Sequence, residues 1–343
     1  MTDILPTKPN LPADFIDCSV GEPHLVREVL FKYFNLDDYV MPQPEKCWEY
    51  PSPFGYKPLV QMLEDKHGHP VVITNGAKQA LGATFYALKK INKQLVGMVT
   101  PYWALLPQLL SMHGLQYTTS SSMINSLSSS NIDSFLLLAP NNPDGQFPIL
   151  SAVEDACKSL KLPLIHDAAY YTHIYVPRTE SLKTYGDAQI FSISKMFGLS
   201  GLRIGYVVCP NPEFYNYVRE YVEHMTVGVS IASQVFLADL INKMKNNPDS
   251  TLKFEEECSQ ALSHVKRSML EVDKEVLDIP ESSVNNCGMF GFFKTGPKFD
   301  QQKARLNFIS GTPFGMPGMI RMNLAWNAVQ IKEIVKRLNE SRE

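Results

Sequence analysis

Between residues 70 and 210, short apolar runs alternate with helical patterns, and this alternation constrains the fold more than any other feature of the chain. The expected strands lie at 71–74, 96–99, 135–138, 164–165, 188–192 and 204–208, and the expected helices at 77–93, 103–114, 150–161 and 212–223. Strands that alternate with helices are typical of a largely parallel sheet covered on both faces. We therefore expect an α/β fold, in which ligands bind beyond the carboxyl ends of the strands.

The pattern changes after about residue 250. Charged helical segments at 251–275 and 328–342 flank short strand candidates around 289–294 and 318–324. This arrangement predicts a large domain over residues 46–245 and a smaller α+β domain built from residues 1–45 and 246–343. The serine-rich stretch at 119–130 is expected to be an exposed loop.

Composition excludes several classes of partner. The 343 residues are 44% hydrophobic and 20% charged, with a net charge of −3 from mixed signs, so we expect no face that binds nucleic acid or anionic lipid. No apolar run approaches the ~18 residues that span a membrane, and the chain starts without the features of a signal peptide. Six cysteines without a CxxC pair are predicted to be buried thiols, so we expect no metal site and a cytoplasmic protein.

One lysine, Lys195, lies among serines, glycines and apolar residues in the segment 191–206. A lysine that is desolvated and close to another cation has a lowered pKa and can attack a carbonyl as an amine. Ser192 and Arg203 flank it, and a hydroxyl and a guanidinium are good phosphate ligands. A bare Ser-Lys pair in a serine-rich loop would mean little. The full spacing instead predicts a site for an aldehyde that carries a phosphate, which describes pyridoxal phosphate.

A second phosphate-binding pattern follows the first expected strand. Gly76, Ala77 and Lys78 open a helix there, so backbone N–H groups and the helix dipole would favour an anion. Many α/β proteins have such turns. Combined with Ser192 and Arg203, the pattern predicts a phosphate cup.

Polar side chains end two further expected strands. Asp167 follows an apolar strand, where a carboxylate is costly unless it is paired, and a protonated pyridine nitrogen is a suitable partner. Tyr170 lies three residues on and could bond a ring hydroxyl. Asn142, in the turn 139–145, could donate to the same oxygen. Taken alone, the aspartate would be a structural cap and the turn only a turn.

Two more positions carry chemistry that a flat, charged ligand needs. Trp103, or its neighbour Tyr102, follows a strand and could stack on a heterocycle, with core packing as the alternative. Arg321 lies in an apolar strand-like segment, where a guanidinium needs an anionic partner. A substrate carboxylate would serve through two parallel hydrogen bonds, as would an internal Asp or Glu.

Together these motifs resemble the fold-type I pyridoxal-phosphate enzymes, specifically the class I and II aminotransferases, in the family's order over about residues 15–326. The resemblance implies a mostly parallel, seven-stranded-type sheet between helices, with a smaller α+β domain. It implies an aminotransferase acting between an α-amino acid and a 2-keto acid through a Lys195 Schiff base. It also implies a homodimer with shared active sites.

The resemblance also gives each residue a role. It implies that the catalytic residues are Lys195, Asp167 and Tyr170, and that the phosphate is held by Gly76, Ala77, Lys78, Ser192 and Arg203. It implies that Asn142 bonds the ring hydroxyl and lies by the substrate, and that Trp103 or Tyr102 stacks on the ring. It also implies that Gly21 and Arg321 bind substrate and that Tyr50 reaches the phosphate of the neighbouring subunit.

The chain departs from the family's usual pattern at two motifs. Asp144 replaces the threonine of Asn-Pro-Thr-Gly, and His24 follows Gly-Glu-Pro where aspartate is common. The chain is also shorter than most relatives. These departures weaken any assignment of the substrate, and a lyase, cyclase or oxidase of the same fold remains the alternative. A regulatory relative without activity is a third alternative, which the complete residue set argues against.

Overall fold

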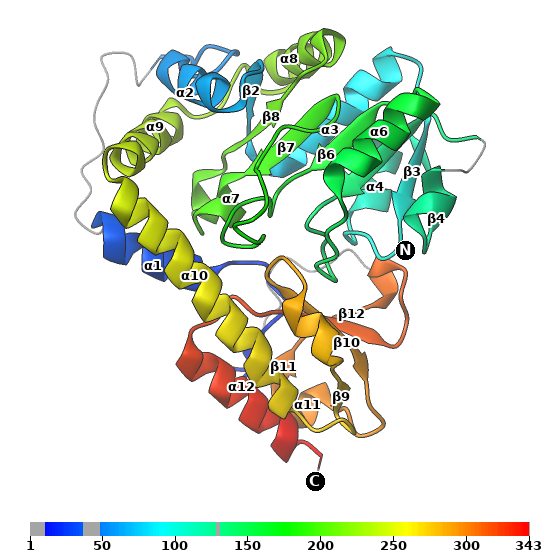
Figure 1. The fold of residues 1–343 in the computed structure, drawn as a ribbon, viewed down its shortest axis with the longest axis vertical. Helices are drawn as coiled ribbons and strands as arrows, with labels where there is room; N and C mark the ends of the chain where they lie inside the picture. Colours follow the sequence, from blue (N-terminus) through cyan, green and yellow to red (C-terminus); the bar gives the residue numbers. More distant parts are fainter. Residues whose placement is uncertain (1–10, 37–48, 128–130, 343) are drawn as a thin grey trace.

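A seven-stranded sheet forms the centre of the larger part of the protein in the computed structural model, which describes residues 11–36, 49–127 and 131–342 (Figure 1). In spatial order its strands are β2 (Val71–Thr74), β8 (Gly205–Val208), β7 (Ala188–Ser192), β6 (Leu164–Asp167), β5 (Ser134–Leu138), β3 (Leu95–Val99) and β4 (Gln116–Ser120). Neighbouring strands are parallel except at β8, which runs antiparallel to both β2 and β7. The predicted mostly parallel sheet is confirmed.

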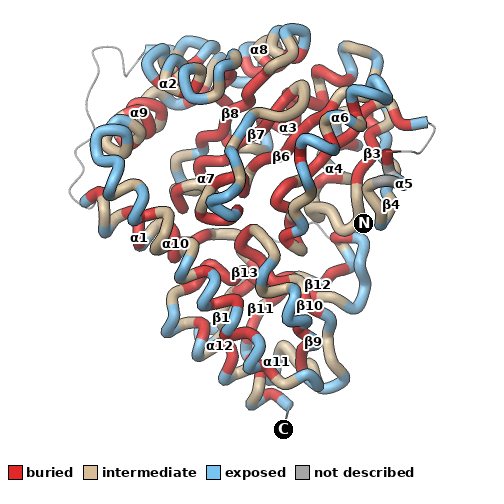
Figure 2. Tube along the Cα trace, viewed as in Figure 1, coloured by how far each residue is buried: buried red, intermediate tan, exposed pale blue. Residues whose placement is uncertain are grey.

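Helices cover both faces of this sheet. They are α2 (Lys57–His67), α3 (Gly76–Lys90), α4 (Leu106–Met112), α5 (Met123–Leu127), α6 (Leu150–Leu160), the short α7 (Ile193–Met196), α8 (Pro212–Thr226) and α9 (Ile231–Asn246). Side chains of α3, α4 and α8 pack with Val72 and Val207 in one core, whereas those of α2, α6 and α9 pack with Ile73 and Tyr206 in the other. Alternate residues of a strand thus enter opposite cores, and Figure 2 shows these strands buried between more exposed helices.

The expected exposed loop at 119–130 was wrong in its first part. Thr119 and Ser120 end β4, and α5 follows from Met123 to Leu127. The apolar runs used to predict strands missed β4, because this edge strand pairs only with β3 and exposes most of its polar side chains. Residues 128–130 lie outside the described part of the chain.

A smaller four-stranded sheet lies below the large one in Figure 1. Its order is β12 (Ile309–Ser310), β13 (Met319–Asn323), β10 (Phe290–Thr295) and β9 (Leu277–Asp278). The accompanying elements are β1 (Ile16–Asp17), α1 (His24–Phe34), the long α10 (Pro248–Ser268), α11 (Gln301–Ala304), β11 (Leu306–Asn307) and α12 (Ala328–Glu340). Helix α10 runs from the end of α9 down along this smaller part (Figure 1).

The N-terminal residues join this smaller part. Strand β1 pairs with β11, the Asn323 amide donates to the Cys18 carbonyl at 2.8 Å, and α1 packs on α10. This contact brings Gly21 and Glu22 between the two sheets. The boundary predicted at residue 46 falls outside the described residues, so the division into 46–245 and the flanking segments stays a prediction.

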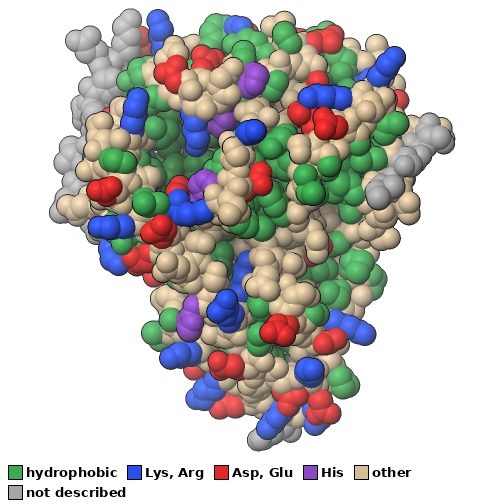
Figure 3. All heavy atoms as spheres, viewed as in Figure 1, with side chains coloured by type: hydrophobic (Ala, Val, Ile, Leu, Met, Phe, Trp, Pro, Cys, Tyr) green, Lys and Arg blue, Asp and Glu red, His purple; other side chains and the backbone are tan. Residues whose placement is uncertain are grey.

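The surface carries mixed charges. Figure 3 shows Lys, Arg, Asp and Glu side chains interspersed over the face in view. Within the described residues, no helix is both long and apolar enough to cross a membrane. Cys18, Cys157, Cys209 and Cys258 are buried as expected and unpaired. Cys287 is also unpaired but only half-buried, so the expectation was wrong for this residue, and Cys47 lies outside the described residues.

Candidate active site

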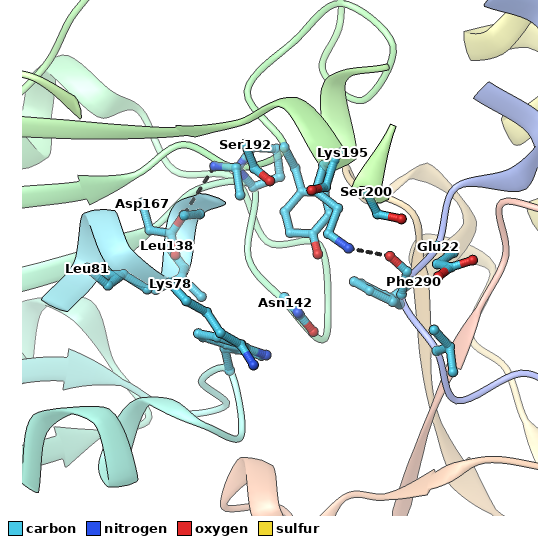
Figure 4. Close-up of a pocket in the computed structure, with 18 of the residues that line it drawn as sticks. Glu22, Lys78, Leu81, Leu138, Asn142, Asp167, Ser192, Lys195, Ser200 and Phe290 are labelled. Carbon is cyan, nitrogen blue, oxygen red and sulfur yellow. Dashed lines mark hydrogen bonds between the residues drawn. The ribbon is translucent and has the colours of Figure 1, made fainter. Parts of the chain in front are cut away.

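A cavity of about 370 Å³ lies where the strands of the large sheet end and the smaller sheet begins (Figure 4). Most of the residues predicted from the sequence border it. The predicted residues in its wall are Gly21, Ala77, Lys78, Trp103, Asn142, Asp167, Tyr170, Ser192, Lys195, Arg203 and Arg321. Because β5, β6 and β7 are parallel, their carboxyl ends deliver side chains to one edge of the sheet.

Lys195 lies in the short helix α7, which begins directly after β7. Its Nζ donates a hydrogen bond to the Gly21 carbonyl, as the dashed line in Figure 4 marks. Burial lowers the pKa of Lys195 to about 8, and the Arg321 charge acts in the same direction, whereas Glu22 opposes them. Lys195 therefore has the lowered pKa expected of a nucleophilic amine, and its role as the nucleophile stays a prediction.

Asp167 is the last residue of β6 and is 6% exposed. Its Oδ1 accepts a hydrogen bond of 3.1 Å from the Ala169 amide, and among the described residues it forms no ion pair. Burial raises the pKa of this carboxyl to about 6, only partly offset by the Ala169 amide. A buried carboxyl that borders a cavity and has no cationic partner of its own is suited to a cationic ligand atom.

Tyr170 and Asn142 lie together in the same wall. Burial raises the pKa of the Tyr170 hydroxyl well above its usual range, opposed by the Arg321 charge and by a hydrogen bond with the Asn142 amide. Asn142 Oδ1 also accepts a hydrogen bond of 3.2 Å from Arg321 Nη1. The two residues predicted to share a ring hydroxyl are thus side by side.

A set of anion-binding groups gathers at the start of α3. This helix begins at Gly76 with no side-chain cap on its first amides and no acidic residue in its first turn. A Cβ added at Gly76 would lie 2.7 Å from Arg203 Nη2, so the guanidinium lies directly over the helix start. Ser192 and Ser200 line the same cavity. Free amides, a guanidinium and hydroxyls suit a phosphate.

Gly205, which sequence reasoning missed, permits this approach. It opens β8 and pairs with Thr74 of β2 and Ser192 of β7. A Cβ at Gly205 would lie 2.7 Å from the Ala77 backbone nitrogen and 2.8 Å from the Phe191 carbonyl oxygen. The start of α3 can therefore reach the edge of the sheet only because this residue has no side chain.

Arg321 of β13 is buried without a carboxylate partner among the described residues. Its Nη2 donates to the Ser19 carbonyl at 2.6 Å, its Nε has no partner, and its guanidinium lies 4.3 Å from the Phe290 ring centroid. Burial lowers the pKa of Arg321 to about 10. Of the two predicted alternatives, an internal acidic partner is therefore excluded for the described residues, and a ligand carboxylate remains.

The two aromatic alternatives separate in the structure. Trp103 borders the cavity with Lys78 Nζ 5.8 Å from its ring centroid. Tyr102 instead lies edge-on to Tyr117, at 6.3 Å between ring centroids, in a neighbouring cavity. Tyr50 is 89% exposed and does not border the cavity of its own chain. Its predicted reach into a neighbouring subunit stays a prediction.

Comparison with known proteins agrees with this geometry. The profile described as aminotransferase class I and II matches residues 43–338. The chain belongs to this family. Tryptophan aminotransferase-related protein 2 of Arabidopsis thaliana is 27% identical over 239 residues, 67% of this chain and 52% of the relative, so the chain spans about half of that protein. Aspartate aminotransferase of Thermotoga maritima is 21% identical and covers 95% of this chain and 91% of its own length.

Solved structures confirm the fold of this class I and II aminotransferase chain. A Thermus thermophilus aspartate aminotransferase tetra mutant complexed with tryptophan superposes with a TM-score of 0.76 at 17% identity, covering 96% of this chain and 92% of the other. At this identity the similarity shows the fold alone.

Phe290 is a cavity residue of this aminotransferase chain that carries no sequence signal, because it enters the wall through the packing of a distant segment. Ser194 and Glu22 also line the cavity and lie in motifs visible in the sequence, but no role was predicted for either. Ser200, three residues before Arg203, accepts from Arg203 Nη1 through its carbonyl at 2.8 Å. The lysine segment 191–206 contains three serines, which could have suggested Ser200 as a further polar residue of the site.

Proposed function

We propose that this chain is a pyridoxal-phosphate-dependent aminotransferase that moves an amino group between an α-amino acid and a 2-keto acid. The observation that carries the proposal is the convergence of three groups on one cavity. They are a lysine amine of lowered pKa, a buried carboxyl without a cation, and a cationic corner at a helix start.

The residues present fit pyridoxal phosphate by their chemistry. The uncapped amides of α3, with Ser192 and Arg203, would hold the phosphate, and Asp167 would hold the ring nitrogen. Asn142 and Tyr170 would hold the ring hydroxyl, and Trp103 would lie on the ring face. The bound cofactor would supply a carbonyl that can condense with the amine of Lys195 or of a substrate, and a ring that accepts electrons.

Lys195 has two tasks in this proposal. Its neutral amine would condense with the cofactor carbonyl, with loss of water, and once a substrate amine has displaced it, the free Nζ could take the proton from the substrate Cα. Since the Nζ pKa is about 8, an appreciable part of the amine is neutral near pH 7. The same Nζ could then deliver the proton on the far side of the nitrogen, at the cofactor carbon that had carried the carbonyl.

Arg321 would orient the substrate. Its guanidinium is held from one side by the Ser19 carbonyl and Asn142 Oδ1, and its partnerless Nε leaves capacity for an anion. A substrate carboxylate that receives two parallel hydrogen bonds fixes the Cα relative to Lys195. Gly21, whose carbonyl accepts from Lys195 Nζ, would close over the substrate from the N-terminal segment.

The finer assignments are part of the same proposal. We propose a homodimer with shared active sites, in which Tyr50 reaches the neighbouring subunit, and a cytoplasmic protein. The high exposure of Tyr50 in the single chain supports the first of these assignments.

The test is a panel of amino acids given to the cofactor-loaded protein. We expect at least one to yield its keto acid and pyridoxamine phosphate without ammonia, and a 2-keto acid to reverse the change. Release of ammonia or peroxide without pyridoxamine phosphate would assign the chain to lyase or oxidase chemistry instead.

A further inference from the structure

The turn that carries Asn142 is held by its own side chains. Asn141 Nδ2 donates to Asp144 Oδ1 at 2.7 Å and to the Pro101 carbonyl at 2.9 Å. The Gln146 amide donates to the same Asp144 oxygen at 3.1 Å. Asp144, the residue that departs from the usual threonine, therefore orients Asn141, and Asn141 ties the turn to the loop before Trp103.

The three-residue segment 286–288, which precedes β10 of the smaller sheet, clamps this turn from outside. Asn286 Nδ2 donates to the Asp144 carbonyl at 2.9 Å, and the Cys287 amide donates to the Gly145 carbonyl at 3.0 Å. The approach is so close that a Cβ at Gly145 would lie 2.1 Å from the Cys287 carbonyl oxygen. Two hydrogen bonds therefore join the smaller sheet to the Asn142 turn.

The same segment also reaches the lysine helix. The Gly288 amide donates to the Tyr175 carbonyl at 3.2 Å, and the Tyr175 hydroxyl donates to the Lys195 carbonyl at 2.8 Å. At its other side, Lys266 of α10 donates to the Asn286 carbonyl. Segment 286–288 thus connects α10 and β10 with the two places that hold Asn142 and Lys195.

We propose that Asp144 and Asn286 are positioning residues that hold Asn142 at the cavity: the Asp144 carboxylate braces the turn from within, and Asn286 clamps the turn to segment 286–288. Asn142 touches Tyr170 and Arg321 inside the cavity, so a shift of the turn moves an amide that both neighbours use. The role of Asn142 toward the cofactor rests on the function proposed above. The clamp itself is a property of the protein alone.

The first test therefore uses the protein without cofactor. Asn286→Ala removes the hydrogen bond to the Asp144 carbonyl, and Asp144→Ala removes the two hydrogen bonds that its carboxylate accepts within the turn. Asn285→Ala removes the exposed neighbouring asparagine, which forms no hydrogen bond with the turn among the described residues. We expect hydrogen exchange of a peptide covering 139–147 to accelerate about tenfold or more in the first two variants, the loss expected for one net hydrogen bond. Exchange of the Asn285→Ala variant should equal that of the wild type.

A second readout follows the cofactor environment. In the loaded Asn286→Ala protein, the pH midpoint of the visible absorbance should move up by about half a unit, because the ring hydroxyl loses part of its hydrogen bond from Asn142. Asp144→Asn keeps the Oδ1 acceptor and should leave the midpoint and the exchange close to wild type, which separates the clamp from a general loss of folding.

The outcomes are distinct. Wild-type exchange of 139–147 in both Asn286→Ala and Asp144→Ala would overturn the clamp, as would equal acceleration in Asn285→Ala. If the protein binds no pyridoxal phosphate but the exchange pattern holds, the function proposed above fails while the clamp stands.

Discussion

Gly205→Ala isolates the contact that brings the start of α3 to the edge of the sheet. The added Cβ would lie 2.7 Å from both the Ala77 nitrogen and the Gly76 carbonyl carbon. Ordinary contact between such atoms begins near 3.5 Å, so the helix start must retreat by about 0.8 Å. Because the opposing atoms are backbone, side-chain rotation cannot relieve the clash.

The expected effects follow from that displacement. Overpacking of this kind costs about 1–3 kcal/mol, which lowers the melting temperature by roughly 1–4 °C for a chain of this length. An amide displaced by 0.8 Å no longer makes a good hydrogen bond to a phosphate oxygen. Loss of one charge-assisted bond corresponds to about 10- to 100-fold weaker binding of pyridoxal phosphate.

Gly201→Ala is the matched control, because Gly201 lies in the adjacent turn and an added Cβ there meets nothing within 4 Å. Thermal unfolding without cofactor and fluorescence titration with pyridoxal phosphate measure the two effects. Wild-type affinity and melting temperature in Gly205→Ala would refute the reasoning. So would equal losses in both variants.

Three further predictions concern charged groups of the cavity. Arg321→Lys should lower kcat/KM for amino acids about 100-fold or more, because the bidentate hydrogen bonds to the substrate carboxylate are lost. The same variant should react as fast as the wild type with a primary amine that lacks a carboxylate. Because the pKa of Asp167 is raised to about 6, its ionisation destabilises the cofactor-free protein as the pH rises from about 4 to 6. The free energy of unfolding of Asp167→Asn, measured in urea, should therefore exceed that of the wild type by about 1–3 kcal/mol at pH 7 and equal it below pH 4. Acylation of Lys195 in the cofactor-free protein, followed by mass spectrometry, should rise with pH around a midpoint near 8.

The sequence predicted the strands that are buried on both faces and the side chains at their ends. Strand β6 and its terminal Asp167 illustrate this, because an apolar run followed by a carboxylate is visible without any tertiary information. The edge strand β4 was missed because one polar, exposed strand resembles a loop. Local pattern therefore identified the buried strands, including the edge strand β2, better than the exposed edge strand β4.

Contacts between distant segments were beyond sequence reasoning. The sequence of residues 286–288 contains no motif that predicts their hydrogen bonds to the Asn142 turn. Phe290 enters the cavity because β10 pairs with β13, which places the ring beside Arg321. Gly205 is similar, since its need for a bare Cα arises from the approach of α3. The roles of such residues arise from packing between distant segments, which the spacing of residues along the sequence does not predict.

The proposed function depends on a covalent bond between Lys195 Nζ and the carbonyl carbon of the cofactor. Reduction of the pyridoxal-phosphate-loaded protein with borohydride, followed by peptide mass spectrometry, tests it most directly, because reduction makes the bond between lysine and cofactor permanent. We predict one modified lysine, Lys195, and no such modification in Lys195→Ala, whose visible absorbance is lost as well. Stoichiometric modification at another lysine, or an unchanged spectrum in Lys195→Ala, would contradict the account.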